Sequence, residues 1–286
     1  MPILRVRLLT SEDAPAFEAF LGPRALSSLF LLSNARQAGF VDHGGPFEGT
    51  YAGAFVGDSL AAVAAHFWNG ILAVQAPDHL ESVIRQAVEA SGRAVAGLTG
   101  PHEQVVAARR ALHLEARPAA VEAPEGLFAL DLADLRVPGA LSSGAVRCRR
   151  PMPEERGLLA AWRAAYRQEV LGEPGGRPSE EAAREDVQAL DQAGAHWVLE
   201  ADGAPCAYSA FNARLPEIAQ VGGVWTPPGL RGRGYARAVV AGSLLNARAR
   251  GVERAVLFTG NSAAERAYRA IGFQRVGTYG LVVFRD

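Results

Sequence analysis

Hydrophobic and polar positions along the chain follow the periods of strands and helices. In the first half, strand-like patterns occupy 3–8, 50–56, 59–68, 71–75 and 94–98, and helical patterns occupy 14–21, 25–37, 79–90 and 103–112. Asn69-Gly70 between two of the strand patterns predicts a tight hairpin. We therefore expect a largely antiparallel sheet flanked by helices.

The second half repeats this kind of pattern. Strands are predicted at 146–149, 196–200, 205–213, 220–226 and 256–259, and helices at 153–170, 179–192 and 236–250. Between the halves, the proline-containing segment 117–143 has one strand-like run at 127–132, which we interpret as the last strand of the first domain followed by a linker. The sequence predicts two α/β (α+β) domains, 1–140 and 144–286.

Short matches between the halves suggest an internal duplication. Arg5-Val6-Arg7 with Glu12-Asp13 matches Arg147-Cys148-Arg149 with Glu154-Glu155 at an offset of 142. Pro77 matches Pro228 at an offset of 151, and 111–114 matches 270–273 at 159. The offsets grow in chain order, as insertions in one copy require.

Composition narrows the class of protein. The 286 residues are 49% hydrophobic and 21% charged, with a net charge of −1, which is typical of globular domains and argues against general binding to nucleic acid or membranes. No apolar run is long enough to span a membrane and no signal peptide is evident, so we expect a cytoplasmic monomer or homodimer. Cys148 and Cys206 lack partners at ligand spacing, so no metal site is predicted.

A strand, a turn and a glycine-punctuated helix start follow one another between Glu217 and Tyr235. The first N–H groups of a helix have no intrahelical partner, and the helix dipole adds positive charge there. Gly232 and Gly234 let the backbone approach an anion closely, while Arg231 and Arg233 add formal charge. This combination predicts a phosphate site.

Two spaced motifs resemble one known family. Arg231-x-x-Gly234-x-Ala236 is similar to the acyl-CoA pyrophosphate loop of the GNAT superfamily of N-acetyltransferases, and the lead-in 224–228 looks like the Val-Tyr-Thr-Pro-Pro form of one bacterial branch. Asn261-x-x-Ala264-x-x-x-Tyr268-x-x-x-Gly272-Phe273 is similar to the GNAT helix that lines the pantetheine arm. The resemblance implies two tandem GNAT-like domains, acetyl-CoA as cofactor, and acetyl transfer to a primary amine of a small molecule or peptide.

The resemblance also implies individual roles. Tyr268 would be the general acid for the departing sulfur, and Asn261 would bond the pantetheine amides. The implied cofactor-binding residues are Val224, Trp225, Thr226, Arg231, Gly232, Arg233, Gly234, Tyr235, Ala236, Asn261, Ala264 and Tyr268. Gly222-Gly223 would suit a bulge that splays strand 220–226 from strand 256–259, or would merely let a helix pack closely.

The general base stays open at this point. Some GNAT enzymes carry a glutamate eleven residues before the loop arginine, but Gln220 stands there in this chain and cannot take a proton. Glu169 and Tyr166 near the end of helix 153–170, and Glu217, are the other candidates. An acceptor amine of low pKa, or deprotonation through water, would remove the need for a base.

Two other functions compete with catalysis. One is a non-catalytic acyl-CoA sensor or structural pseudoenzyme, and the other is RNA binding through Arg231 and Arg233, which requires a broader basic face. In the first domain, the alignment places Leu80-Glu81-Ser82-Val83 opposite the glycine-rich loop. Glu81 would repel a pyrophosphate, so the first domain is predicted to lack a CoA site.

Overall fold

The computed structural model describes residues 3–173 and 175–285 and divides the chain into two compact units. Unit 1 comprises residues 1–126 and 277–286, and unit 2 comprises residues 127–276. These boundaries differ from the predicted domains 1–140 and 144–286. The difference arises because the C-terminal strand pairs inside unit 1, while the end of the strand before the linker belongs to unit 2.

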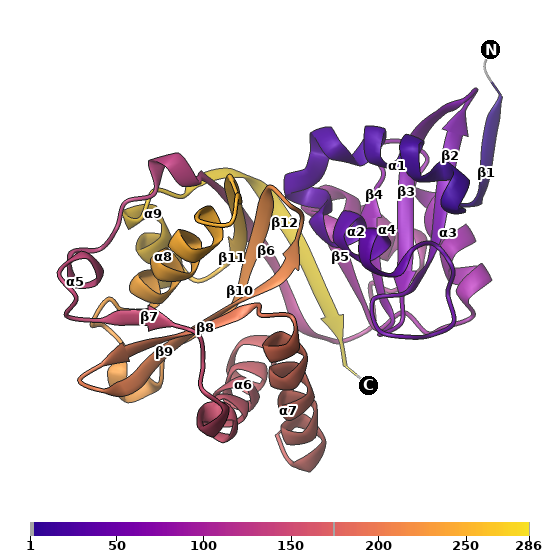
Figure 1. Cartoon of the computed structure of the whole chain (residues 1–286). Helices are drawn as coiled ribbons and strands as arrows, with labels where there is room; N and C mark the ends of the chain where they lie inside the picture. Colours follow the sequence, from indigo (N-terminus) through magenta and orange to yellow (C-terminus); the bar gives the residue numbers. More distant parts are fainter. Residues whose placement is uncertain (1–2, 174, 286) are drawn as a thin grey trace. The chain divides into compact units, whose positions relative to one another are not determined.

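Unit 1 is a mixed sheet with helices around it (Figure 1). Its elements are β1 (Leu4–Leu8), α1 (Ala14–Leu21), α2 (Ala25–Ala38), β2 (Gly49–Val56), β3 (Ser59–Phe67), β4 (Ile71–Gln75), α3 (Leu80–Ser91), β5 (Gly97–Pro101) and α4 (His102–Ala111). The strand order is β1-β2-β3-β4-β5-β12, where β12 is Gln274–Phe284. Among the described strand pairs of this unit, β4 and β5 are parallel and the others are antiparallel.

Unit 2 repeats the arrangement. Its elements are the end of β6 (Ala119–Asp131), α5 (Gly139–Ser142), β7 (Arg147–Arg149), α6 (Arg156–Leu171), α7 (Arg177–Gln192), β8 (His196–Ala201), β9 (Ala204–Arg214), β10 (Ile218–Trp225), α8 (Tyr235–Arg248), β11 (Arg254–Thr259) and α9 (Ser262–Ala270). The order is β6-β11-β10-β9-β8-β7, with β10 and β11 parallel. The predicted fold class, a mixed and mostly antiparallel sheet flanked by helices in each half, is confirmed.

The two faces of the sheet in unit 2 are covered by different helices, as Figure 1 shows. On one face α8 and α9 pack on a large apolar core that includes Ala219, Val221 and Leu257. On the other face α6 and α7 cover a smaller cluster that includes Tyr208, Ala210 and Trp225. Because alternate residues of a strand point to opposite faces, both faces of β10 are buried.

Several predicted elements differ from the structure. β6 spans 119–131, so the strand predicted at 127–132 begins eight residues earlier than expected. β5 lies at 97–101 instead of 94–98, and β12 was not predicted at all. The helix predicted at 179–192 begins two residues earlier, at Arg177 of α7, so Ser179 does not cap it, and the buried Ser179 hydroxyl has no partner among the described residues.

The same ion pair forms at the start of both halves. Arg7 donates to Asp13, and Arg149 donates to Glu155, at the offset of 142 that the sequence comparison gave. Each carboxylate also accepts a backbone N–H three residues earlier, from Thr10 in unit 1 and Met152 in unit 2. Together with the repeated element order, this shared geometry supports an internal duplication.

Glu155→Gln is expected to lower the free energy of unfolding by about 2 kcal/mol near neutral pH. The change removes a charge from a mostly buried pair, and only Glu200 would still balance Arg149. The hydrogen bonds from Arg149 lower the pKa of Glu155, although burial acts the other way. Its stabilising effect is therefore complete above the ordinary value of 4.5 and is lost as the pH falls through the lower folded value.

Urea unfolding of the wild type and the variant, followed by tryptophan fluorescence at neutral and acid pH, measures this difference. The exposed neighbour Glu154 provides the control, because Glu154→Gln removes the same charge outside the pair. An equal effect of both variants, or a difference that does not shrink on acidification, would contradict the assignment.

Among the described residues, no helix combines the length and apolar character that crossing a membrane requires.

Candidate active site

The start of α8 presents unpaired backbone donors. Gly234 is the N-cap residue, with φ of 79°, and has no side chain with which to cap the helix. The first capping bond runs from the Ala238 N–H to the Gly234 carbonyl. Within the described residues, no hydrogen bond occupies the N–H groups of Tyr235, Ala236 and Arg237. These donors and the helix dipole form an anion site.

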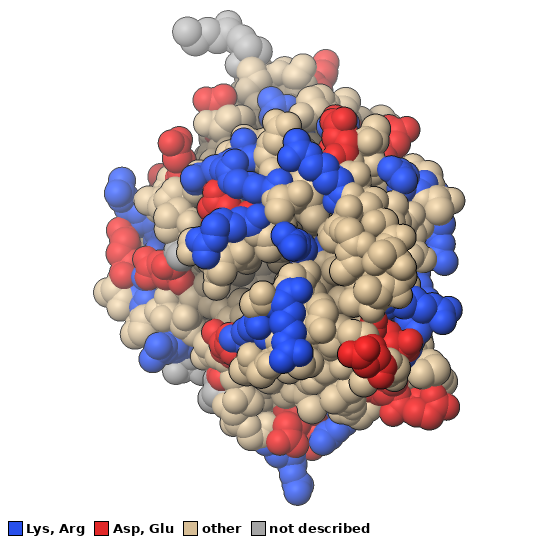
Figure 2. Space-filling view, turned by 90° about the vertical axis from the view of Figure 1, so that its left-hand side faces the viewer, with Lys and Arg blue, Asp and Glu red and all other residues tan. Residues whose placement is uncertain are grey.

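Arginines surround this helix start, and one of them, Arg237, was not predicted. Arg233 is exposed beside Gly232, whose φ of 80° only glycine adopts readily. Arg237, which the sequence analysis missed, brings its guanidinium to 3.0 Å from the point that a Cβ on Gly234 would occupy. Its place in the first helical turn, three residues after Gly234, was the available signal. Figure 2, which views the molecule from the left-hand side of Figure 1, shows basic side chains gathered around a hollow and acidic ones mostly toward the edges.

Strands β10 and β11 separate along their length. Their parallel register pairs Ile218, Ala219 and Gln220 with 254–256, and no pair is recorded in the described residues beyond Gln220. Opposite β9, the register shifts between Gly222 and Trp225, and Gly223 has φ of 60°. A bulge was one of the two roles predicted for Gly222-Gly223. Because the described pairing of β10 with β11 ends at Gln220 while both strands continue, we infer a gap between these two parallel strands.

Two buried polar atoms near this gap lack protein partners. The Gln220 side chain is 2% exposed; its Nε2 donates to the Val221 carbonyl, and its Oε1 accepts from no described group. The Thr226 hydroxyl, just after β10, is likewise buried and unpaired. Six other buried polar atoms of the described residues are unpaired as well, but these two lie on β10 and directly after it, where a ligand in the gap would supply the missing bonds. The neighbours Val224 and Trp225 pack on opposite clusters.

The helix after β11 begins at the predicted motif. Asn261 is its N-cap, and its Oδ1 accepts from the N–H groups of Ala263 and Ala264 at 2.9 and 3.0 Å. This oxygen is therefore committed to the helix, which leaves the amide Nδ2 as the group that can face a ligand. Ala264 packs against the core with Tyr235.

Tyr268 lies inside unit 2 at the inner end of this helix. It is 7% exposed, and its ring contacts Phe273 with centroids 6.1 Å apart. Burial, with a smaller effect of Tyr166, raises the pKa of Tyr268 above its ordinary value of 10.0. No hydrogen bond within the described residues occupies the hydroxyl. The structure thus holds a protonated phenol, positioned by packing, whose O–H can donate to a ligand.

The candidate bases are placed differently from one another. Glu169 forms a two-bond ion pair with Arg231 at 2.9 Å, with both side chains about half exposed. Arg231 also donates to the Thr226 carbonyl and stacks on Trp225, so its guanidinium joins α6 to the end of β10. Glu217 precedes β10 at the end where the strands are still paired.

Arg163 on α6 is a site residue that the sequence analysis missed. Its Nη1 lies 2.8 Å from the point that a Cβ on Gly223 would occupy, so the guanidinium covers the bulge of β10. The Nε donates to Asp186 at 2.8 Å, and the Tyr166 ring lies beneath the guanidinium at 5.2 Å. An arginine in an amphipathic helix usually faces solvent, which is why its spacing gave no signal.

The loop between strand and helix is much shorter in unit 1. There β4 ends at Gln75 and α3 begins at Leu80, and His79 takes the left-handed N-cap conformation that Gly234 takes in unit 2. The alignment of Leu80-Glu81-Ser82-Val83 with the glycine-rich loop is therefore wrong, because these residues form the first turn of α3. Only 76–79 are left for a loop, against 226–234 in unit 2.

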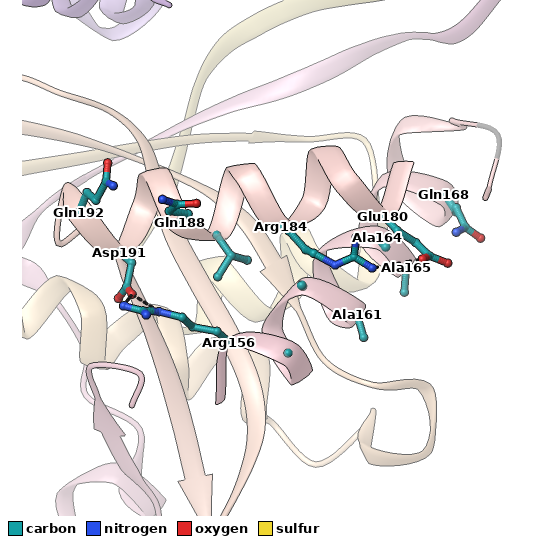
Figure 3. Close-up of a pocket in the computed structure, with 13 residues that line it drawn as sticks. Arg156, Ala161, Ala164, Ala165, Gln168, Glu180, Arg184, Gln188, Asp191 and Gln192 are labelled. Atoms are coloured by element: carbon teal, nitrogen blue, oxygen red, sulfur yellow. Dashed lines mark hydrogen bonds and ion pairs between the residues drawn. The ribbon is translucent and has the colours of Figure 1, made fainter. Parts of the chain in front are cut away.

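A groove of about 1190 Å³ lies between α6 and α7 (Figure 3). Small residues of α6, among them Ala161 and Ala165, form its floor, and polar side chains of α7 form its rim. The Arg156–Asp191 ion pair closes one end. Its lining contains none of the residues predicted for the site, so the groove is separate from the gap between β10 and β11. No metal-binding group of three or more His, Cys, Asp or Glu residues occurs in the described part of the chain.

The site combines an anion-binding helix start with a gap that contains unpaired polar atoms. The unpaired N–H groups of α8 and Arg237 suit a pyrophosphate, and the gap with its unpaired Gln220 and Thr226 atoms suits an amide-containing arm. Tyr268 stands where the predicted helix joins the core.

Residues 159–273 match the model of the acetyltransferase (GNAT) family. None of the curated proteins compared matches the chain.

Solved structures match almost the whole chain at low identity. A GCN5-related N-acetyltransferase from Sphaerobacter thermophilus is 16% identical with a TM-score of 0.59, over 98% of this chain and 94% of that one. An acetyltransferase from the GNAT family from Colwellia psychrerythraea is 17% identical with a TM-score of 0.52, over 98% and 100%. A tandem GNAT protein from the clavulanic acid biosynthesis pathway is 13% identical with a TM-score of 0.59, over 98% of both chains. At these identities the likeness concerns the fold.

Proposed function

We propose, on the premise that residues 159–273 form a domain of the acetyltransferase (GNAT) family, that the chain transfers an acetyl group from acetyl-CoA to a primary amine. Membership of the family supports an acyltransferase; acetyl as the group and an amine of a small molecule or peptide as the acceptor are our proposal. The observation that carries this proposal is that unit 2 contains both an anion site at the start of α8 and a gap between β10 and β11.

Each part of the site has a separate task. The N–H groups of Tyr235, Ala236 and Arg237 hold the pyrophosphate, and the glycines before them allow its close approach. Gln220 Oε1 and the Thr226 hydroxyl bond the pantetheine arm in the gap. When bound, acetyl-CoA supplies an acetyl group already activated as a thioester. Holding the amine beside the thioester accounts for most of the rate enhancement, because it converts a bimolecular step into an effectively unimolecular one.

Proton transfer requires a donor and an acceptor. Tyr268 holds a proton at its hydroxyl for the departing sulfur, and its raised pKa keeps that proton in place at neutral pH. Glu169 is paired with Arg231, and Gln220 has no basic atom. We therefore propose that the amine reaches the site neutral, or loses its proton to water, without a carboxylate base.

The lack of a suitable carboxylate base among the described candidates favours a second function. Such a site also suits a protein that binds acyl-CoA as a sensor and does not catalyse its turnover. The two functions share the cofactor contacts, and only product formation with an amine separates them.

Calorimetric titration with acetyl-CoA is expected to show one binding site per chain. Unit 1 has no room for a glycine-rich loop between Gln75 and Leu80, and His79 caps its helix, so within the described residues such a loop with a glycine-capped helix start occurs in unit 2. A stoichiometry of two would contradict the reading of unit 1. Absence of binding would overturn the proposed function, and binding without acetylation of any amine in a broad screen would favour the sensor.

A further inference from the structure

Neighbouring side chains fix the orientation of the Arg163 guanidinium beside Gly223, at the gap between β10 and β11. Its Nε donates to Asp186 Oδ2 at 2.8 Å, and the same oxygen accepts from Arg167 at 2.7 Å. The side chain is 14% exposed, and Tyr166 supports one face of the guanidinium. Because α6 and α7 both hold this side chain, its guanidinium has little freedom to turn away from Gly223.

The outer end of this guanidinium has no partner. Within the described part of the chain, no hydrogen bond occupies Nη1 or Nη2, and Nη1 is the atom that lies over Gly223. A guanidinium carries five N–H donors in a planar fork, and two parallel N–H groups match the two oxygens of a carboxylate. A mostly buried fork with unused donors is a site for an anion.

Charged neighbours keep Arg163 ionised in its place. The guanidinium groups of Arg163 and Arg167 share one oxygen of Asp186. Glu173 pairs with the Nε of Arg167, so Arg167 has a carboxylate of its own and Asp186 is the acidic partner of Arg163. Burial alone would lower the pKa of Arg163, but Asp186 outweighs it and holds that pKa above its ordinary value, so the charge persists.

We propose that Arg163 binds an anionic group of the acceptor, so that the substrate is an amine that also carries a carboxylate, as an amino acid does. The inference rests on the proposed acetyl transfer, since it uses the bulge at Gly223 as the place where the amine must arrive. A carboxylate bound at Nη1 and Nη2 leaves an amine a few bonds away beside the gap. Arg163 then determines specificity and takes no part in proton transfer.

Matched acceptors test this directly. The wild type is compared on amino acids and their carboxamides, which share the carbon skeleton, at equal concentrations of the neutral amine because the two amines differ in pKa, with an aminoalkyl phosphate as a second anionic arm. We expect kcat/KM to favour the acid over the amide by about 100-fold, mainly through KM. Arg163→Gln should reduce this preference to near unity by weakening the acid, whereas Arg163→Lys, which keeps the charge without the fork, should keep part of it. Preference for the phosphate arm would assign the same anion site to a phosphorylated amine.

Two further measurements distinguish a failure of the anion site from a failure of the proposed acetyl transfer. Acetyl-CoA affinity should change less than about twofold in Arg163→Gln, and Arg184→Gln, which removes an exposed arginine of α7, should leave the preference intact. Calorimetric binding of N-acetylated acids and amides reports the anion site without turnover. Binding of the acid that depends on Arg163, without transfer to any amine, would keep the anion site and overturn the transferase. Transfer to acids and amides alike, or an equal loss of both in Arg163→Gln, would overturn the anion site alone.

Discussion

Gly234→Glu is expected to weaken acetyl-CoA binding by at least about 100-fold while unit 2 stays folded. The N-cap position has φ of 79°, which costs a side chain about 1–2 kcal/mol in that conformation. A carboxylate placed there would also lie beside the N–H groups that hold the pyrophosphate and repel it. Calorimetry measures the loss, and circular dichroism with thermal unfolding checks that the fold persists.

Two variants separate the causes of that loss. Gly234→Ala introduces the backbone strain without the charge and should weaken binding much less than glutamate does. Gly157→Glu adds the same charge at an exposed position of α6 with open space around it and an ordinary φ, and should leave affinity unchanged. Binding by Gly234→Glu at wild-type strength would show that the phosphates bind elsewhere on the chain.

Tyr268→Phe is expected to lower turnover by about 100-fold with little change in acetyl-CoA affinity. Phenylalanine keeps the packing against Phe273 and the buried ring, so only the O–H donor is lost. Because burial raises the pKa of Tyr268 above 10.0, the wild-type enzyme should show no loss of activity from its ionisation at ordinary working pH. Steady-state assays that follow release of free CoA, with binding measured separately, give both quantities.

Tyr279→Phe is the matched control for this prediction. Tyr279 is another buried tyrosine, 3% exposed, in the C-terminal strand of unit 1. Removing its hydroxyl should leave turnover unchanged. If Tyr268→Phe turned over at the wild-type rate, the departing sulfur would have to take its proton from another group or from solvent.

The amino-acid sequence by itself determined most of the local structure. Period-two and period-3.6 patterns predicted α1, β4 and most of α8 within one or two residues, because half-buried elements must place apolar side chains on one face. The glycines at 232 and 234 predicted the helix start that the structure shows, since few other residues adopt those backbone angles. The fold class in each half followed from this order of elements.

Only the tertiary structure decided with which unit the C-terminal strand pairs and which side chains surround the gap between β10 and β11. β12 has partners in unit 1 because strand pairing depends on long-range register, which no local pattern encodes. The pairing of Glu169 with Arg231, the capping by Asn261 Oδ1, and the position of Arg163 over Gly223 likewise join residues far apart in the chain or depend on side-chain rotamers. The sequence supplied the chemical groups, and packing of α6, α7 and α9 around the split strands determined which of those groups face the gap.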